Sequence, residues 1–254
     1  FDDAPIPGRV IDIFKAGRAI PRSVSLFFVH GGGWKFGGRA IFHKIIHGFT
    51  ELGFDCASTD YRLNKVSVVD QVADIRTGLD IFCGDLQKRR RPRNIVFLGS
   101  SAGGHLALLT ALSRPEEYGV PSRKLTQRHR VSGVAVQAAP FTFEPWPDIF
   151  PESWDAMQAA IGAPYPDRKD LYVQASPMTY VRSGMPPVFA LHAANEHMFP
   201  LSLFRKFKAR AKSFSARVFH RTYANAEHGF FYDLERRQQK EAFEDILQFI
   251  ASLE

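Results

Sequence analysis

The segment Gly99-Ser100-Ser101-Ala102-Gly103 constrains the fold of this chain more than any other feature. An apolar run, residues 95–98, leads into it, and a helix-forming run, residues 105–109, follows it. Strand, tight turn and helix in this order are the context in which G-x-S-x-G forms a nucleophile elbow. The two outer glycines meet the need for small residues where strand and helix pass close together. We therefore predict that Ser101 is a nucleophile. The other interpretations are a glycine-rich turn or a phosphate-binding loop, although no Gly-Lys-Ser/Thr follows.

Around this segment, predicted strands and helices alternate. Strands are expected at residues 10–14, 23–30, 54–61, 95–98, 131–137, 188–192 and 216–223. Helices are expected at residues 42–52, 68–86, from 105 to before Pro115, 201–212 and around 243–253. This alternation predicts an α/β fold with a mostly parallel central sheet flanked by helices on both faces. No repeat, low-complexity tract or linker divides the 254 residues, so one catalytic domain, residues 1–254, is expected.

The alternation breaks between residues 138 and 180. This insert is rich in proline and in large aromatic residues: Phe141, Phe143, Trp146, Phe150, Trp154, Tyr165 and Tyr172. An irregular insert of this length is usually functional. We predict a lid-like insert whose aromatic side chains line a pocket, with Phe141 a tentative substrate-binding residue. The alternative is that these aromatics only pack the insert onto the domain.

Charge and hydropathy restrict the possible partners. The formal net charge is +7, much of it in basic runs at residues 88–93 and 123–130. Both runs fall between a predicted helix and the next strand and contain no aromatic residue that could stack on a base, which favours solvated turns over nucleic-acid binding. No apolar run is long enough to span a bilayer, so no membrane segment is expected. The chain starts at Phe1, which is compatible with a removed signal peptide or tag and leaves the compartment open.

The chain has two cysteines, Cys56 and Cys83. Two cysteines exclude a disulfide framework and a cysteine-rich zinc site. One lies on a predicted strand and the other on the next helix, where they could in principle meet. We predict two buried free thiols, because cysteine often serves as a small core residue.

A serine nucleophile needs a base and an acid that orients the base. In a parallel sheet these groups are expected on loops at the carboxyl ends of later strands. Glu196 follows the strand at 188–192 and His228 follows the strand at 216–223, in the order serine, acid, histidine. His197 is the main rival base and Glu227 the rival acid. Five other histidines are predicted to be structural or exposed: His30, His43, His47, His105 and His220. No H-x-x-H or HExxH spacing, which would indicate a metal site, appears in the sequence.

A glycine-rich loop at residues 30–38 follows the second predicted strand. An ester under attack forms an oxyanion that needs N–H donors already in place. We predict that the backbone N–H groups of Gly32, Gly33 and Ala102 form this oxyanion hole. The Trp34 N–H is an alternative donor, and Trp34 is a tentative substrate-binding residue.

Together these motifs resemble the α/β-hydrolase superfamily, and within it the bacterial feruloyl-esterase-like and hormone-sensitive-lipase-like esterases. The matching segments are His30–Trp34, Asp60–Leu63, Gly99–Gly104, Ser176-Pro177, Pro186–Val188 leading to Glu196, and His228–Phe230. They run from about residue 24 to the C-terminus. The resemblance implies an α/β-hydrolase fold with Ser101, Glu196 and His228 as its triad.

Three features depart from that pattern. Glu196 stands where aspartate is usual, and Ser100 stands where the lipase-like group often has aspartate, which favours the feruloyl-esterase-like group. Residues 64–66 are Asn-Lys-Val in place of Ala-Pro-Glu. Little chain precedes the first strand, so we expect no N-terminal cap helices and a fairly open site.

The predicted function is a serine carboxylesterase that hydrolyses short-chain or aromatic acyl esters through an acyl-enzyme, with carbohydrate-linked, feruloyl-type esters among the candidates. Its partner would be a small-molecule or polymer-borne ester, and no cofactor or metal is implied. An arylformamidase or another amidase would use the same triad. A non-catalytic binding protein on a hydrolase fold is the alternative of a different class. The oligomeric state is left open.

Overall fold

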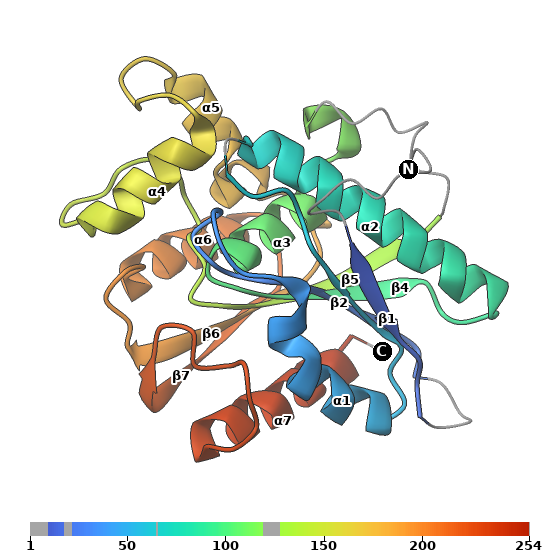
Figure 1. The fold of residues 1–254 in the computed structure, drawn as a ribbon. Helices are drawn as coiled ribbons and strands as arrows, with labels where there is room; N and C mark the ends of the chain where they lie inside the picture. The colour runs from blue at the N-terminus through green and yellow to red at the C-terminus, as the bar shows by residue number, and fades with distance from the viewer. Residues whose placement is uncertain (1–9, 18–21, 65, 119–127, 254) are drawn as a thin grey trace.

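The computed structural model describes residues 10–17, 22–64, 66–118 and 128–253. Seven strands form one sheet in the order β1-β3-β2-β4-β5-β6-β7 (Figure 1). The strands are β1 (Ile11–Phe14), β2 (Ser25–Val29), β3 (Cys56–Thr59), β4 (Asn94–Ser100), β5 (Arg130–Gln137), β6 (Val188–Asn195) and β7 (Val218–Glu227). Only β1 pairs antiparallel among them. The predicted mostly parallel α/β sheet is confirmed.

Helices cover both faces of this sheet. The α-helices are α1 (His43–Glu51), α2 (Val68–Lys88), α3 (Ala102–Leu112), α4 (Pro151–Ile161), α5 (Lys169–Gln174), α6 (Leu201–Ser213) and α7 (Arg237–Ala251). Short 3₁₀ helices are η1 (Arg39–Phe42), η2 (Pro115–Tyr118) and η4 (Pro177–Tyr180). In Figure 1, α1 and α7 lie below the sheet, and α2, α3 and α6 lie above it. Because β2 to β7 run parallel, their carboxyl ends lie at the same end of the sheet, between the two layers of helices.

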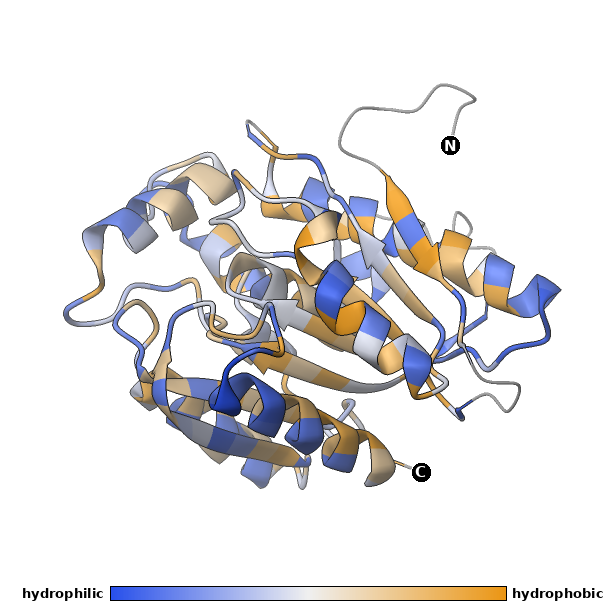
Figure 2. Cartoon of the chain, turned by 60° about the horizontal axis from the view of Figure 1, so that its bottom comes forward, coloured by the Kyte–Doolittle hydropathy of each residue, from blue (hydrophilic) through white to orange (hydrophobic). Residues whose placement is uncertain are grey.

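The sheet separates two hydrophobic clusters. Neighbouring residues of β2 point to opposite faces: Phe27 belongs to the cluster under α2 and α3, and Phe28 to the cluster under α1 and α7. Figure 2 shows the same pattern, with apolar strands inside and polar residues on the helix that leads to the C-terminus. Strands buried on both faces explain the long apolar runs in the sequence.

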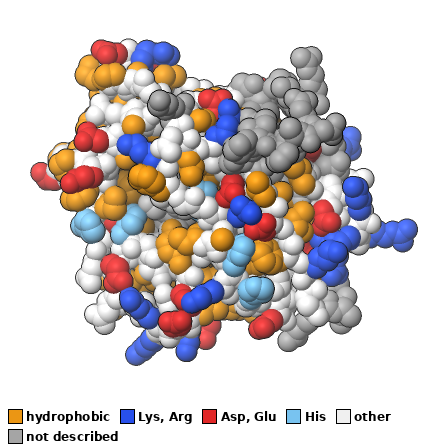
Figure 3. Space-filling model, in the orientation of Figure 1, with side chains coloured by type: hydrophobic (Ala, Val, Ile, Leu, Met, Phe, Trp, Pro, Cys, Tyr) orange, Lys and Arg blue, Asp and Glu red, His pale blue; other side chains and the backbone are white. Residues whose placement is uncertain are grey.

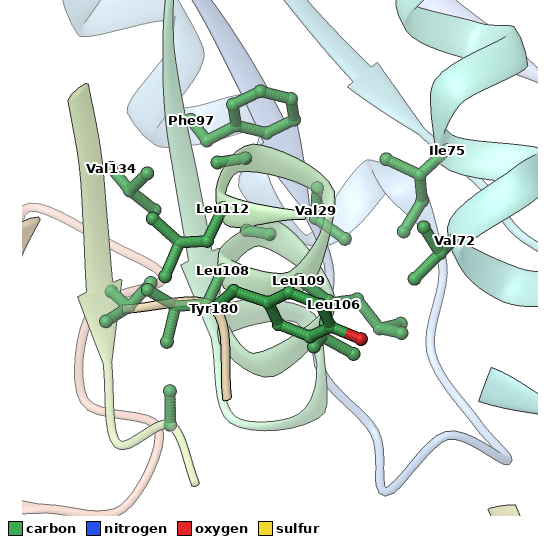
Figure 4. Close-up of a cluster of buried hydrophobic side chains, with 14 of the residues drawn as sticks. Val29, Val72, Ile75, Phe97, Leu106, Leu108, Leu109, Leu112, Val134 and Tyr180 are labelled. Atoms are coloured by element: carbon green, nitrogen blue, oxygen red, sulfur yellow. The ribbon is translucent and has the colours of Figure 1, made fainter. Parts of the chain in front are cut away.

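The helix after the nucleophile motif is the most completely buried of the described helices. Every residue of α3 is buried, in keeping with its apolar residues on all sides. Figure 4 shows its leucines packed between Phe97 and Val134 of the sheet and Val72 and Ile75 of α2. This packing holds the start of α3, and with it the preceding turn, in a fixed position.

The region from 138 to 180 is more regular than predicted, because α4, α5 and η4 lie within it. Pro151 begins α4, and Gly162, with φ of 84°, ends it. Four of its aromatics, Phe141, Phe143, Trp146 and Tyr172, are buried in the cluster under α2 and α3. The prediction that the insert's aromatics line the active-site pocket is wrong for these four, which pack the insert onto the domain.

Cys56 and Cys83 are buried free thiols, as predicted. They belong to the two different hydrophobic clusters, so the sheet lies between them. No helix in the described part of the chain is long and apolar enough to cross a membrane.

The basic run at 88–93 is not simply a solvated turn. Asp55 is 2% exposed, and it accepts hydrogen bonds from Arg89 at 2.7 Å and lies 3.0 Å from the Arg91 guanidinium. Two of these arginines therefore neutralise a buried carboxylate, which explains part of the run by internal pairing. In the second run, Arg123 and Lys124 lie outside the described residues.

Candidate active site

The turn between β4 and α3 has the geometry of a nucleophile elbow. Ser101 has φ of 54° and ψ of −125°, a conformation that residues with a side chain rarely adopt. A Cβ on Gly103 would lie 2.2 Å from the carbonyl oxygens of Val29 and His30, so this position requires glycine. The close approach of α3 to β2 thus explains the small residue two positions after Ser101.

Hydrogen bonds from β5 secure the elbow. The Ser101 N–H donates to the Gln137 carbonyl at 2.8 Å. The Ser100 hydroxyl donates to the Gln137 side-chain oxygen at 2.6 Å, and both side chains are buried. Ser100, the residue that departs from the lipase-like pattern, therefore has a structural partner beneath the nucleophile.

Three predicted residues form a continuous hydrogen-bonded chain. His228 Nε2 lies 2.9 Å from Ser101 Oγ. On the other side of the imidazole ring, His228 Nδ1 lies 2.9 Å from Glu196 Oε2 and 3.1 Å from Glu196 Oε1. Glu196 directly follows β6 and His228 directly follows β7. The structure thus brings together the serine, histidine and acid at the distances that proton transfer requires.

The longer acid is held by backbone donors. Glu196 Oε1 accepts hydrogen bonds from the N–H groups of Met198 at 2.8 Å and Phe199 at 3.3 Å. Its side chain is fully buried. Burial acts to raise the pKa of Glu196, but hydrogen bonds and charge attraction from His228 and the two N–H groups hold that pKa below its usual range. These contacts favour the carboxylate form of Glu196, hydrogen-bonded to the His228 ring.

The rival residues lie elsewhere. His197 is exposed and packs edge-on against Phe150, with ring centroids 5.4 Å apart. Glu227 is exposed and pairs with Arg236 at 2.8 Å. Neither contacts Ser101 or His228 by a hydrogen bond. The geometry selects His228 and Glu196 over both rivals.

Of the predicted oxyanion donors, Gly32 and Gly33 line the same cavity as Ser101, and Ala102 directly follows Ser101. Gly32 and Gly33 have φ of 122° and 56° and form a tight turn that is closed by N–H groups of Lys35 and Phe36 on the Gly32 carbonyl. A Cβ on Gly33 would meet no atom within 4 Å, so this backbone borders open space. Ala102 is the first residue of α3, where backbone N–H groups lack partners within the helix. These features are compatible with N–H groups that are available to donate hydrogen bonds to an oxyanion.

The predicted substrate-binding residues have different positions. Trp34 lines the cavity at Ser101, and its indole N–H donates to His105 Nδ1 at 3.2 Å. His105 Nε2 in turn donates to the Ala175 carbonyl at 2.7 Å, and burial lowers the pKa of His105 to about 3. His105 is therefore a neutral link between the glycine loop, α3 and the end of α5. Phe141 packs against Phe207 and does not border the cavity at Ser101, so it has no place in the proposal below.

A cavity of about 450 Å³ opens at Ser101 and His228. Its walls are Gly32, Gly33, Trp34, Glu152, Ser153, Ala156, Met198, Phe199, Gly229 and Tyr232. Sequence analysis missed the three residues of α4 in this wall because it treated residues 138–180 as irregular. The signal was present: Pro151 and Glu152 are typical of a helix start, and Trp154, Met157 and Ile161 follow at helical spacing.

Within the described residues, no group of three or more histidine, cysteine, aspartate or glutamate side chains is arranged to hold a metal ion.

Comparisons with known proteins find a matching family and several relatives. A family model described as BD-FAE matches residues 11–210. Esterase LipQ from Mycobacterium tuberculosis is 29% identical over 239 residues, which cover 87% of this chain and 54% of that protein. Esterase LipC from the same organism is 26% identical, over 88% of this chain and 57% of that protein. The chain thus spans about half the length of the curated relatives it matches.

Solved structures show the same fold. Esterase Est2 from Thermogutta terrifontis, solved with bound butyrate, has a TM-score of 0.76 at 24% identity, covering 96% of this chain and 88% of that chain. Esterase B from Lactobacillus rhamnosis has a TM-score of 0.82 at 18% identity, covering 99% of this chain and 83% of that chain. The resemblance drawn from the motifs is confirmed: this chain has the α/β-hydrolase fold and belongs to the BD-FAE family.

Proposed function

We propose that this chain is a serine carboxylesterase. The observation that carries the proposal is the hydrogen-bonded chain from Ser101 through His228 to Glu196, of which Ser101 and His228 line a cavity. The names of the curated relatives, which are esterases or a probable carboxylic ester hydrolase, support the same reaction class.

The proposed reaction has two halves. His228 Nε2 accepts the Ser101 proton as Oγ attacks the ester carbonyl, and the N–H groups of Gly32, Gly33 and Ala102 stabilise the oxyanion. The imidazolium, stabilised by Glu196, then protonates the leaving alcohol as the C–O bond breaks, which leaves the acyl group on Ser101. Water repeats the sequence: His228 takes its proton, the acyl–enzyme bond breaks, and the acid is released as Ser101 regains its proton.

Short-chain or aromatic acyl esters are the proposed substrates, with carbohydrate-linked esters among them. Trp34, Phe199, Tyr232 and Met198 give the cavity flat or flexible apolar walls that suit an acyl chain or an aromatic ring. The butyrate complex of Est2 concerns that enzyme, and it supports testing short acyl groups here.

Hydrolysis of a p-nitrophenyl ester series, from acetate to octanoate plus ferulate, tests the proposal. We expect turnover by the wild type and its loss in Ser101→Ala. A wild type inert on every ester would contradict the proposal and favour an amidase or a binding protein. Hydrolysis of the amide in a matched pair of ester and amide substrates would then identify an amidase, whereas a binding protein would hydrolyse neither. An aryl-acyl rate no higher than the acetyl rate would remove aromatic esters from the substrate class.

A further inference from the structure

The glycine-rich loop holds Trp34 in a backbone conformation that large residues rarely adopt. Gly32, Gly33 and Trp34 follow one another with φ of 122°, 56° and 62°. Glycine tolerates this left-handed region, but a residue with a bulky side chain is strained there. Such strain persists only where the surroundings fix the conformation. Because the two glycines carry the predicted oxyanion donors, the contacts that fix Trp34 also restrain the backbone that presents those donors.

Trp34 is held through both its side chain and its backbone. Its indole N–H donates to Nδ1 of His105 on α3 at 3.2 Å. Its carbonyl accepts a hydrogen bond from Nε2 of Gln71 on α2 at 2.9 Å. Its ring packs edge-on against His105 and Phe143, with ring centroids 5.5 and 5.1 Å apart. Two helices thus fix a residue that lines the cavity at Ser101.

The two polar partners of Trp34 can each bond in only one way. An indole nitrogen only donates, and a backbone carbonyl only accepts. His105 must therefore accept at Nδ1 and donate from Nε2, which lies 2.7 Å from the Ala175 carbonyl. The Gln71 amide nitrogen likewise faces two carbonyls, those of Trp34 and Arg62, at 2.9 and 3.0 Å. Each partner is thus held in one orientation by a second hydrogen bond.

These partners form a buried and uncharged support. Figure 3 shows charged side chains spread over the surface of the molecule. Gln71 and His105 are instead fully buried, and the lowered pKa of His105 keeps its ring neutral at pH 7. The His105 N–H donates to the Ser101 carbonyl at 3.0 Å, in the first turn of α3. One helix therefore starts at the nucleophile and holds the oxyanion loop one turn later.

We propose that His105 and Gln71 are positioning residues for the oxyanion hole, which they direct at Ser101 by fixing Trp34. This inference rests on the proposed esterase function. Both halves of the reaction form an oxyanion, and its stabilisation depends on donors that are already in place. A misplacement of about 1 Å can cost about 10²-fold in rate. Loss of either partner should therefore lower kcat and change KM little, because the ester still binds while its oxyanion is less well stabilised.

Steady-state kinetics on p-nitrophenyl butyrate test this role. His105→Phe keeps a ring beside Phe143 but removes the acceptor, and Gln71→Met removes the donor at similar length. We expect each variant to lower kcat by about 10- to 100-fold, with KM within about threefold of the wild-type value. His105→Asn, whose side-chain oxygen can take the place of Nδ1, should retain more of kcat than His105→Phe.

A trifluoromethyl ketone gives a second measurement that reports on the oxyanion hole itself. Ser101 Oγ adds to the ketone carbonyl, His228 takes the serine proton, and the carbonyl oxygen becomes an oxyanion in the same hole. We expect the Ki of this inhibitor in each variant to rise by about the factor by which kcat/KM falls. An unchanged Ki in a variant with reduced kcat would contradict the proposed role.

Two comparisons show whether the effect acts through Trp34. Trp34→Phe removes the same hydrogen bond from the other side, so the double variant with His105→Phe should have a kcat close to that of the slower single variant. Tyr118→Phe removes a hydroxyl that donates to the Gln174 carbonyl at 2.5 Å. It loosens the same end of α5 that His105 contacts but leaves the glycine loop untouched, so kcat should stay at the wild-type value.

The outcomes separate this inference from the esterase proposal. Wild-type turnover with an unchanged kcat in His105→Phe, a multiplicative loss in the double variant, or an equal loss in Tyr118→Phe overturns this inference and leaves the esterase proposal standing. Should His105→Phe fail to fold, Trp34→Phe and Gln71→Met carry the same test through kcat and Ki. A wild type inert on all esters removes both proposals.

Discussion

The cavity has two unlike sides. On the catalytic side, Ser101, His228 and Glu196 are already linked by hydrogen bonds, and the acid has two further backbone donors. On the α4 side, Glu152 is exposed and the Ser153 hydroxyl is unpaired. Groups that stabilise a transition state act best when they need no rearrangement. The contrast therefore predicts that changes to the hydrogen-bonded chain from Ser101 to Glu196 affect activity far more than changes on the α4 side.

If the catalytic side is complete, the base should be irreplaceable. We expect His228→Gln to lower kcat/KM by about 10⁴-fold or more, since triad residues act as a unit. The control is His197→Gln, which changes the exposed histidine next to Glu196 and should retain wild-type activity. Steady-state kinetics on p-nitrophenyl butyrate measure both. Equal losses in the two variants would contradict the assignment of the base.

The acid should matter nearly as much. Glu196→Gln keeps the shape but removes the charge that fixes the histidine tautomer, so we expect kcat to fall about 10³- to 10⁴-fold. Glu227→Gln, the matched change one residue before the histidine, affects an exposed pair with Arg236 and should leave kcat unchanged. Full activity in Glu196→Gln would show that another group orients His228.

The tight packing of the elbow can be tested by measuring how glycine substitutions change the free energy of unfolding. A methyl group on Gly103 would lie 2.2 Å from two backbone oxygens, so Gly103→Ala should lower the free energy of unfolding by at least about 3 kcal/mol. Gly162→Ala at the end of α4 meets no atom within 4 Å and should cost only about 1 kcal/mol of backbone strain. Urea unfolding compares the two. A larger loss in Gly162→Ala would reverse the proposed contrast between the rigid elbow and the α4 region.

His105 links the glycine loop to the end of α5, and its effect on stability should appear with pH. Burial lowers the pKa of His105 to about 3 in the folded chain, against about 6.5 when exposed, so the unfolded chain binds the extra proton first. Folded-state stability is therefore full above about pH 6.5 and declines towards pH 3, by up to about 1.4 kcal/mol per pH unit. Urea unfolding at pH 7 and pH 4.5 should show a smaller decline for His105→Gln. An unchanged decline would mean that other groups govern acid unfolding.

The catalytic side was predictable from the sequence because its geometry depends on local motifs. Gly99 and Gly103 mark a close approach, and Glu196 and His228 follow the neighbouring parallel strands β6 and β7, so their positions come from the sheet topology. The α4 side was not predictable to the same degree. The sequence alone does not distinguish an aromatic residue that is buried in the core, such as Phe143, from one that lines a pocket. Only the tertiary packing shows which of the two positions the residue occupies. The Ser153 hydroxyl has no hydrogen-bond partner, and this depends on the positions of all its neighbours in the fold. The spacing of residues in the sequence does not reveal it.

The same limit applies to the basic run at 88–93. From the sequence we predicted a solvated turn. In the structure, Arg89 and Arg91 form ion pairs with the carboxylate of Asp55, a residue beside β3 that is distant in the sequence. Pairing between distant residues is set by the fold and leaves no periodic signal.

The most direct test of the central claim is covalent labelling of the nucleophile. Thermogutta terrifontis esterase 2 has been solved phosphorylated by paraoxon, which makes this compound a suitable probe. We expect paraoxon to inactivate the wild type and to leave one phosphoryl adduct, located by peptide mass spectrometry on Ser101. Ser101→Ala should acquire no adduct, and His228→Gln should react far more slowly. An unmodified Ser101 in an inactivated protein, or a protein that paraoxon does not modify, would contradict the assignment of Ser101 as an activated nucleophile.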